Sequence, residues 1–160
     1  MIIIVTGAPG SGKTKTVKQL MESTLNSAAI DGDPLLGINP FNRTTKERKL
    51  QYKNIADVSK NYHDSGYKTV FISFVYGESQ LKMQLELLEV IDKVEVFVLV
   101  PTEKTLRERH ANDSYAREEI QPSLELNKNM SELENVHIIN NSDMSIEQVA
   151  TRIKRTMGLD

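Results

Sequence analysis

The chain has 160 residues, a formal net charge of −2 and no cysteine. This length predicts a single domain spanning residues 1–160, large enough to bury a hydrophobic core. The absence of thiols excludes disulfide bonds, thiolate catalysis and cysteine-based metal sites, and the small net charge gives no general attraction for nucleic acid or for an anionic membrane.

An apolar run at residues 2–5 leads directly into the sequence Gly-Ala-Pro-Gly-Ser-Gly-Lys-Thr at residues 7–14. This segment matches G-x-x-x-x-G-K-[ST], a phosphate-binding loop between a strand and a helix. Its glycines allow the backbone to approach a polyphosphate, and its amides and the helix N-terminus attract anionic oxygens. We expect Lys13 to contact the β- and γ-phosphates of ATP and Thr14 to ligate Mg²⁺. The predicted nucleotide-binding residues are Gly7, Pro9, Gly10, Ser11, Gly12, Lys13, Thr14 and Lys15.

Helix and strand patterns alternate along the rest of the chain. Apolar or β-branched runs predict strands at residues 28–30, 68–75, 94–100 and 136–139. Helical periodicity and capping residues predict helices at 13–23, 44–64, 102–109 and 145–157, and a further helix capped by Ser79 with Leu81, Leu85, Leu88 and Ile91 on one face. We therefore predict a three-layer, doubly wound α/β domain with a five-stranded parallel sheet and the phosphate loop after its first strand. The polar segment at about residues 109–123 is expected to be a lid.

Two acidic residues, Asp31 and Asp33, follow the second predicted strand. Ligands of doubly wound sheets bind at the carboxyl ends of the strands, so both carboxylates are expected near the phosphate loop. We assign Asp31 to the metal ion and Asp33 to proton abstraction from a substrate hydroxyl. The alternative is that Asp-Gly-Asp-Pro is a turn sequence without a catalytic role, since these residue types favour turns.

Several segments, taken together, carry a family resemblance. They are the loop at residues 7–14, Ile30-Asp31-Gly32-Asp33, Gly37-Ile38-Asn39, the helix at 54–66, Phe71-Ile72-Ser73, the strand at 96–101 and the segment 140–145. In this combination the chain resembles the adenylylsulfate kinase family, within the small P-loop kinases that include shikimate kinase. The resemblance implies transfer of the γ-phosphate of ATP to a hydroxyl of a small molecule. It also implies that Asp33, Asn39 and Ser73 lie around the acceptor.

The chain departs from that family where an anionic acceptor is held. The family has an arginine soon after Asp-Gly-Asp, whereas this chain has Pro34-Leu35-Leu36. The family's acceptor-binding arginine and asparagine at the start of the following helix correspond only loosely to Arg48, Lys49 and Gln51. The basic residues of this segment are equally consistent with a solvated helix face. Because a guanidinium fork is the natural partner of an oxyanion, the identity of the acceptor stays open.

Further candidates lie in the loops. Arg109 and Arg117 flank the predicted lid and are assigned to the phosphates as catalytic cations, with ordinary helix-surface charge as the alternative. Phe41 is a candidate for stacking on an acceptor, or else a loop anchor, and Arg43 follows it as a candidate substrate-binding residue.

Three functions remain open. The favoured one is a small-molecule kinase that uses ATP and Mg²⁺. The alternatives are a kinase acting on the 5′-hydroxyl of a polynucleotide, for which the sequence shows no basic groove with stacking aromatic residues, and a nucleotide-dependent switch without phosphotransfer. We expect a cytoplasmic protein, because the N-terminal apolar run is too short for a signal sequence and no stretch approaches membrane-spanning length. The oligomeric state is left undetermined.

Overall fold

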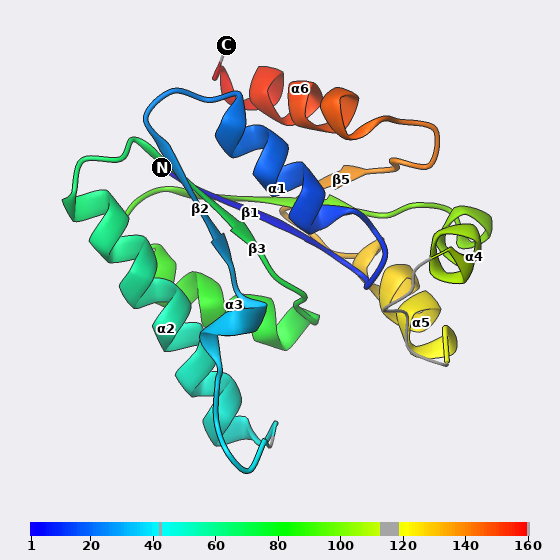
Figure 1. Cartoon of the computed structure of the whole chain (residues 1–160), viewed down its shortest axis with the longest axis horizontal. Helices are drawn as coiled ribbons and strands as arrows, with labels where there is room; N and C mark the ends of the chain where they lie inside the picture. Colours follow the sequence, from blue (N-terminus) through cyan, green and yellow to red (C-terminus); the bar gives the residue numbers. More distant parts are fainter. Residues whose placement is uncertain (42, 113–118, 160) are drawn as a thin grey trace.

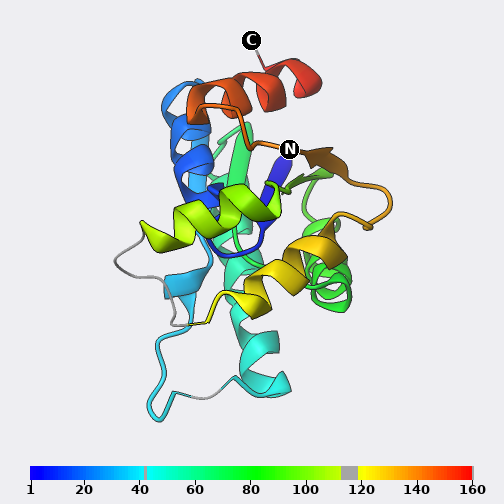
Figure 2. The same ribbon diagram turned by 90° about the vertical axis from the view of Figure 1, so that its right-hand side faces the viewer.

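The computed structural model describes residues 1–41, 43–112 and 119–159 (Figure 1). Its five strands form one parallel sheet in the order β2-β3-β1-β4-β5. The strands are β1 (Ile2–Gly7), β2 (Ser27–Asp31), β3 (Thr69–Ser73), β4 (Val94–Leu99) and β5 (His137–Ile139). The predicted fold class is confirmed: helices cover both faces of a five-stranded parallel sheet (Figure 2).

The central strand β1 is buried on both faces, and its side chains alternate between two cores. Ile2 and Ile4 pack in the core that contains residues of α2 (Thr45–Asp64) and α3 (Glu78–Leu88). Ile3 and Val5 pack in the opposite core, which contains residues of α1 (Lys13–Glu22) and α6 (Ile146–Met157). The loop that follows β1 therefore starts from the most constrained strand of the sheet.

Two helices differ from the sequence-based expectation. Helix α3 begins at Glu78, and the side-chain oxygen of Gln80 accepts a hydrogen bond from the Gly77 amide at 2.9 Å, so the prediction that Ser79 caps this helix was wrong. Ile91 follows the end of α3 and does not belong to it. The other difference is α5 (Gln121–Met130), a helix that was not predicted.

Helix α4 (Glu103–Ala111) lies where a helix was predicted, and the Thr102 side chain caps it by accepting a hydrogen bond from the Thr105 amide. The predicted lid at about 109–123 therefore includes the end of α4 and the start of α5, and residues 113–118 between them lie outside the described residues. None of the helices in the described part of the chain has the length and apolar character needed to cross a membrane.

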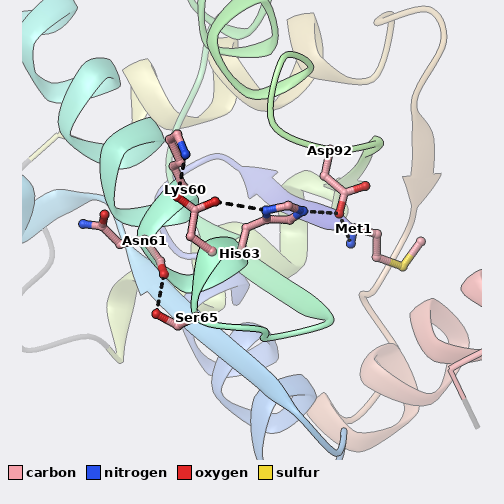
Figure 3. A network of polar contacts seen from close by, with 7 residues as sticks. Met1, Lys60, Asn61, His63, Ser65 and Asp92 are labelled. Atoms are coloured by element: carbon pink, nitrogen blue, oxygen red, sulfur yellow. Dashed lines mark hydrogen bonds and ion pairs between the residues drawn. The ribbon is translucent and has the colours of Figure 1, made fainter.

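A polar network near the amino ends of the strands includes Met1, His63 and Asp92 (Figure 3). The phosphate loop lies at the opposite, carboxyl ends of the strands. The Met1 ammonium donates to the Lys68 carbonyl at 2.8 Å and to the Asp92 carboxylate at 2.6 Å. This contact lowers the pKa of Asp92. His63, near the end of α2, lies between the carboxylates of Asp92 and Asp64, at 3.6 and 3.5 Å. The network links the end of α2 to the entries of β1 and β3.

Candidate functional site

The phosphate loop has the tight geometry that its glycines permit. Gly7 has φ 155°, and a Cβ there would lie 2.7 Å from the Leu99 carbonyl oxygen, so no larger residue fits. Gly12 has φ 100° at the N-cap of α1, and the helix starts at Lys13. The positive end of α1 thus faces the concave side of the loop, as an anion site requires.

Two side chains hold the loop through the carbonyl oxygen of Ser11. Asn141, just after β5, donates to this oxygen at 2.8 Å, and Arg109 of α4 donates to it at 3.1 Å. Arg109 also donates to the Asn141 carbonyl at 3.0 Å, and burial lowers the pKa of its guanidinium. The structure therefore places Arg109 against the backbone of the loop. Its predicted role at the phosphates stays a prediction.

The Lys13 side chain is nearly buried and faces the acidic turn after β2. Burial lowers the pKa of its ammonium, and the carboxylates of Asp33 and then Asp31 oppose that shift. The structure thus brings Lys13, Asp31 and Asp33 together, as the sequence predicted from the strand ends.

The acidic turn is fixed from three sides. The Asp31 carboxylate accepts the Asp33 amide at 3.2 Å, and Gly32 donates its amide to the Ser73 carbonyl at 2.9 Å. Gln51 of α2 donates to the Gly32 carbonyl at 2.8 Å and to the Asp33 carbonyl at 3.4 Å. A short 3₁₀ turn, η1 (Asp33–Leu35), follows. Asp33 is therefore an exposed carboxylate on a restrained backbone.

Oxygen ligands suited to Mg²⁺ meet at the ends of α1, β2 and β3. The hydroxyls of Thr14 and Ser73 are 3.1 Å apart, and Asp31 lies opposite Ser73 in the register of β2 and β3. Hydroxyl and carboxylate oxygens next to a phosphate-binding loop are the donors that this ion takes. The residues present therefore fit the ion that the phosphate loop implies.

A pocket of about 580 Å³ opens beside Lys13 and Asp33. Among the predicted site residues it is lined by Pro9, Gly10, Lys13, Asp33, Arg43 and Arg48. Asn39 and Phe41 do not line it, and the Phe41 ring is 63% exposed with the Arg43 guanidinium 5.5 Å from its centroid. Lys15 is an exposed residue of α1, and Arg117 lies outside the described residues.

Gln51, one of the counterparts of the family's acceptor-binding residues, lines the pocket one helical turn after Arg48. Several other lining residues were not predicted. Tyr52 follows Arg48 on the same face of α2, a helical spacing from which it was predictable. Phe74 packs edge-on against Tyr52, with ring centroids 6.3 Å apart, and forms part of the floor. Gln80 and His110 reach the pocket from α3 and α4, and no local sequence pattern pointed to either residue.

Comparison with known proteins shows the family to which this chain belongs. A family model described as an AAA domain matches residues 3–140. The chain belongs to this AAA-domain family. A search of curated proteins found no match to this AAA domain.

The AAA domain is similar to several solved structures over nearly its whole length. The tunicamycin resistance protein of Deinococcus radiodurans superposes with a TM-score of 0.83 and 17% identity, over 99% of this chain and 96% of that one. Shikimate kinase from Aquifex aeolicus gives 0.66 and 20%, over 99% and 96%. A gluconokinase from Sinorhizobium meliloti 1021 gives 0.69 and 17%, over 98% and 94%. At these identities the likeness establishes the fold alone, which this chain shares with the shikimate kinase, the gluconokinase and the tunicamycin resistance protein.

Proposed function

We propose that this AAA domain is an ATP-dependent phosphotransferase that moves the γ-phosphate of ATP to a hydroxyl of a small molecule. The observation that carries the proposal is the shared pocket: Lys13 of the phosphate loop and Asp33 of the acidic turn line the same cavity of about 580 Å³. That volume is typical of a small-molecule site.

The roles follow from the placement of each group. The loop amides and Lys13 bind the β- and γ-phosphates, while Thr14 and Asp31 hold Mg²⁺, which neutralises charge on the phosphates when bound. Asp33 accepts the proton of the acceptor hydroxyl. The hydroxyl oxygen then forms a bond to the γ-phosphorus as the bond from that phosphorus to the β–γ bridging oxygen breaks, and ADP leaves.

The lining of the pocket supports a polar acceptor. Arg43, just before α2, and Arg48, in its first turn, bring guanidinium groups to the pocket. The largely buried rings of Tyr52 and Phe74 also line it. An anionic acceptor such as adenylylsulfate is compatible with these arginines, although they come from other positions than the family's first arginine. The names of the similar structures suggest shikimate, gluconate and tunicamycin as further acceptors to test.

The test is a coupled assay of ATP turnover with a panel of acceptors: adenylylsulfate, shikimate, gluconate, tunicamycin, nucleosides, sugars and a 5′-hydroxyl oligonucleotide. We expect one class of small molecule to raise turnover well above the rate with water alone. If no hydroxyl acceptor does so, the proposal is wrong. Turnover with the oligonucleotide alone would favour the polynucleotide kinase.

The Asp33→Asn variant tests the assigned base. General-base catalysis contributes roughly 10²-fold or more, so we expect kcat to fall by at least about that factor while ATP still binds. Asp57→Asn is the matched control, because Asp57 is an exposed acid of α2 paired with Lys53, outside the pocket. A kcat for Asp33→Asn within about threefold of the wild type would exclude the base role.

A further inference from the structure

A second cavity, of about 760 Å³, lies between α3 and α5. Much of its lining is apolar and comes from both helices and from the segment before β5: Leu81, Leu85, Leu126, Met130, Leu133 and Val136. The charged residues that line it include Glu78 and Lys82, which form an ion pair at 2.7 Å. We call this cavity the α3–α5 groove.

The α3–α5 groove adjoins the pocket of about 580 Å³ beside Lys13 and Asp33, which we call the reaction pocket. Gly77 and Leu126 line both cavities, and both residues are partly exposed. On α5, Pro122, Ser123 and Leu126 line the reaction pocket, and Leu126, Asn129 and Met130 line the groove. Successive members of this set are three to four positions apart, so one side of α5 extends from the reaction pocket into the α3–α5 groove. A helix of this length is about 15 Å long. Figure 2 shows α5 leading from the α4 side of the molecule toward α3.

Another apolar cavity, between α2 and α3, is separated from the reaction pocket. The only lining residue that the two share, within the described part of the chain, is Tyr52, whose side chain is 2% exposed. Because the Tyr52 ring is almost fully buried, it separates the two cavities and leaves no open passage between them. The α3–α5 groove is therefore the apolar surface that a molecule bound beside Asp33 can reach.

We propose that the acceptor is an amphiphile: its hydroxyl-bearing head occupies the reaction pocket and an apolar tail, such as an alkyl or acyl chain, lies in the α3–α5 groove. This inference rests on the proposed phosphotransfer and names the class of acceptor. A tail joined to the head is held close to the groove, so its binding adds to that of the head without the entropy cost of a second ligand. Continuity with the reaction pocket selects this occupant over a separate partner.

The size of the effect is set by the apolar surface that is buried. Burial of one methylene contributes about 0.8 kcal/mol, which corresponds to roughly fourfold in affinity. Four methylenes fully buried in the groove should therefore strengthen binding by about two orders of magnitude. The gain should stop once the chain exceeds the groove.

The experiment uses n-alkyl β-D-glucosides as probes, with methyl, butyl, hexyl and octyl chains, each below its micellar concentration. Their dissociation constants are measured by calorimetry on the full chain with a non-hydrolysable ATP analogue bound. The wild type is compared with Leu85→Lys, which puts a charge on the groove. The control is Leu87→Lys, an identical change two residues along α3, where the side chain lines the cavity between α2 and α3 instead.

We expect affinity to rise at least twofold per methylene from butyl to octyl, and Leu85→Lys to remove this rise while Leu87→Lys keeps it. Leu133→Gln provides a second groove variant if Leu85→Lys does not fold. No measurable binding of octyl glucoside, an affinity that does not depend on chain length, or a rise that survives both groove variants would overturn the inference. The acceptor panel reports separately: transfer to a short polar acceptor with flat chain-length dependence would leave the proposed function standing. Absence of transfer to every acceptor would overturn that function whatever the calorimetry shows.

Discussion

Replacing Gly32 with alanine tests how the acidic turn is built. Gly32 has φ −76° and ψ −22°, which any residue adopts, so the glycine is needed for space and not for backbone freedom. An alanine Cβ would lie 2.6 Å from Cδ2 of Phe74 and 2.9 Å from Cδ1 of Ile55. Carbon atoms prefer roughly 3.5–4.0 Å, so both side chains must move by about 1 Å at a place where the core is packed.

Overpacking of this kind typically costs about 1–3 kcal/mol, and alanine returns about 0.4–1 kcal/mol by restricting the unfolded chain. We therefore expect Gly32→Ala to lower the free energy of unfolding by about 1–2 kcal/mol and Tm by roughly 3–8 °C, measured by urea and thermal denaturation. Gly37→Ala is the control: a Cβ there would meet no described atom within 4 Å, so stability should hold or rise slightly.

The double variant Gly32→Ala/Phe74→Ala identifies the clashing partner. Alanine at position 74 removes Cγ and Cδ2, the ring atoms that the new Cβ would meet, so the double variant should be more stable than the sum of the single effects predicts. Equal stabilities of Gly32→Ala and Gly37→Ala would refute the steric argument, and strict additivity of the pair would show that Phe74 is not the obstacle.

Three further predictions concern the loop and the turn. Lys13→Met should abolish ATP binding yet raise the free energy of unfolding by about 1 kcal/mol, because it removes a buried ammonium; nucleotide titration and urea melts check both. The folded-state pKa of Lys13 lies below its usual 10.5, so the unfolded chain binds more protons than the folded chain as the pH rises toward 10.5. Wild-type stability should therefore rise with pH in that range, and the stability difference from Lys13→Met should narrow. Asn141→Asp replaces the donor to the Ser11 carbonyl with an acceptor, so a fluorescent ATP analogue should bind about tenfold more weakly. The control Asn140→Asp keeps the oxygen to which Ser142 donates and should bind the analogue as the wild type does. Equal affinities of the two variants would show that Asn141 does not hold the phosphate loop in its binding conformation. Gln51→Met leaves the buried Gly32 carbonyl without its side-chain donor, so the free energy of unfolding should fall by about 1–3 kcal/mol. We expect kcat to fall by a larger factor than the affinity for ATP. An unchanged kcat would mean that Asp33 does not depend on the hydrogen bond from Gln51.

Local patterns were sufficient for most of the fold. The strands are short β-branched runs buried on one or both faces, and the loop at residues 7–14 has a spacing with a single structural meaning. Helix α5 was missed because its apolar period is interrupted. Asn127 occupies one of its buried positions, where its amide donates to the Pro101 carbonyl at 2.8 Å, a tertiary contact that no local pattern reveals.

The predicted cap of α3 was wrong for a related reason. Ser79 is a common cap residue, but Gln80 bonds the Gly77 amide and starts the helix two residues earlier. In the site, Lys13, Asp31 and Asp33 were predictable because parallel strands end at one edge. Tyr52 and His110 belong to helices whose position over that edge depends on packing across the whole sheet.

The acidic turn and the two arginines of the reaction pocket are held in place by different contacts. This separation bears on how specificity for the acceptor can change. The acidic turn is secured by Ser73, Phe74 and Gln51, whereas Arg43 and Arg48 stand at the outer start of α2, where Arg48 donates to the Arg43 carbonyl at 3.2 Å. Under the proposed function, we therefore expect selectivity for the head of the acceptor to depend on Arg43 and Arg48, which line the pocket. Replacing these two residues with those of a chain that has a different acceptor should retarget phosphotransfer while the acidic turn keeps its geometry.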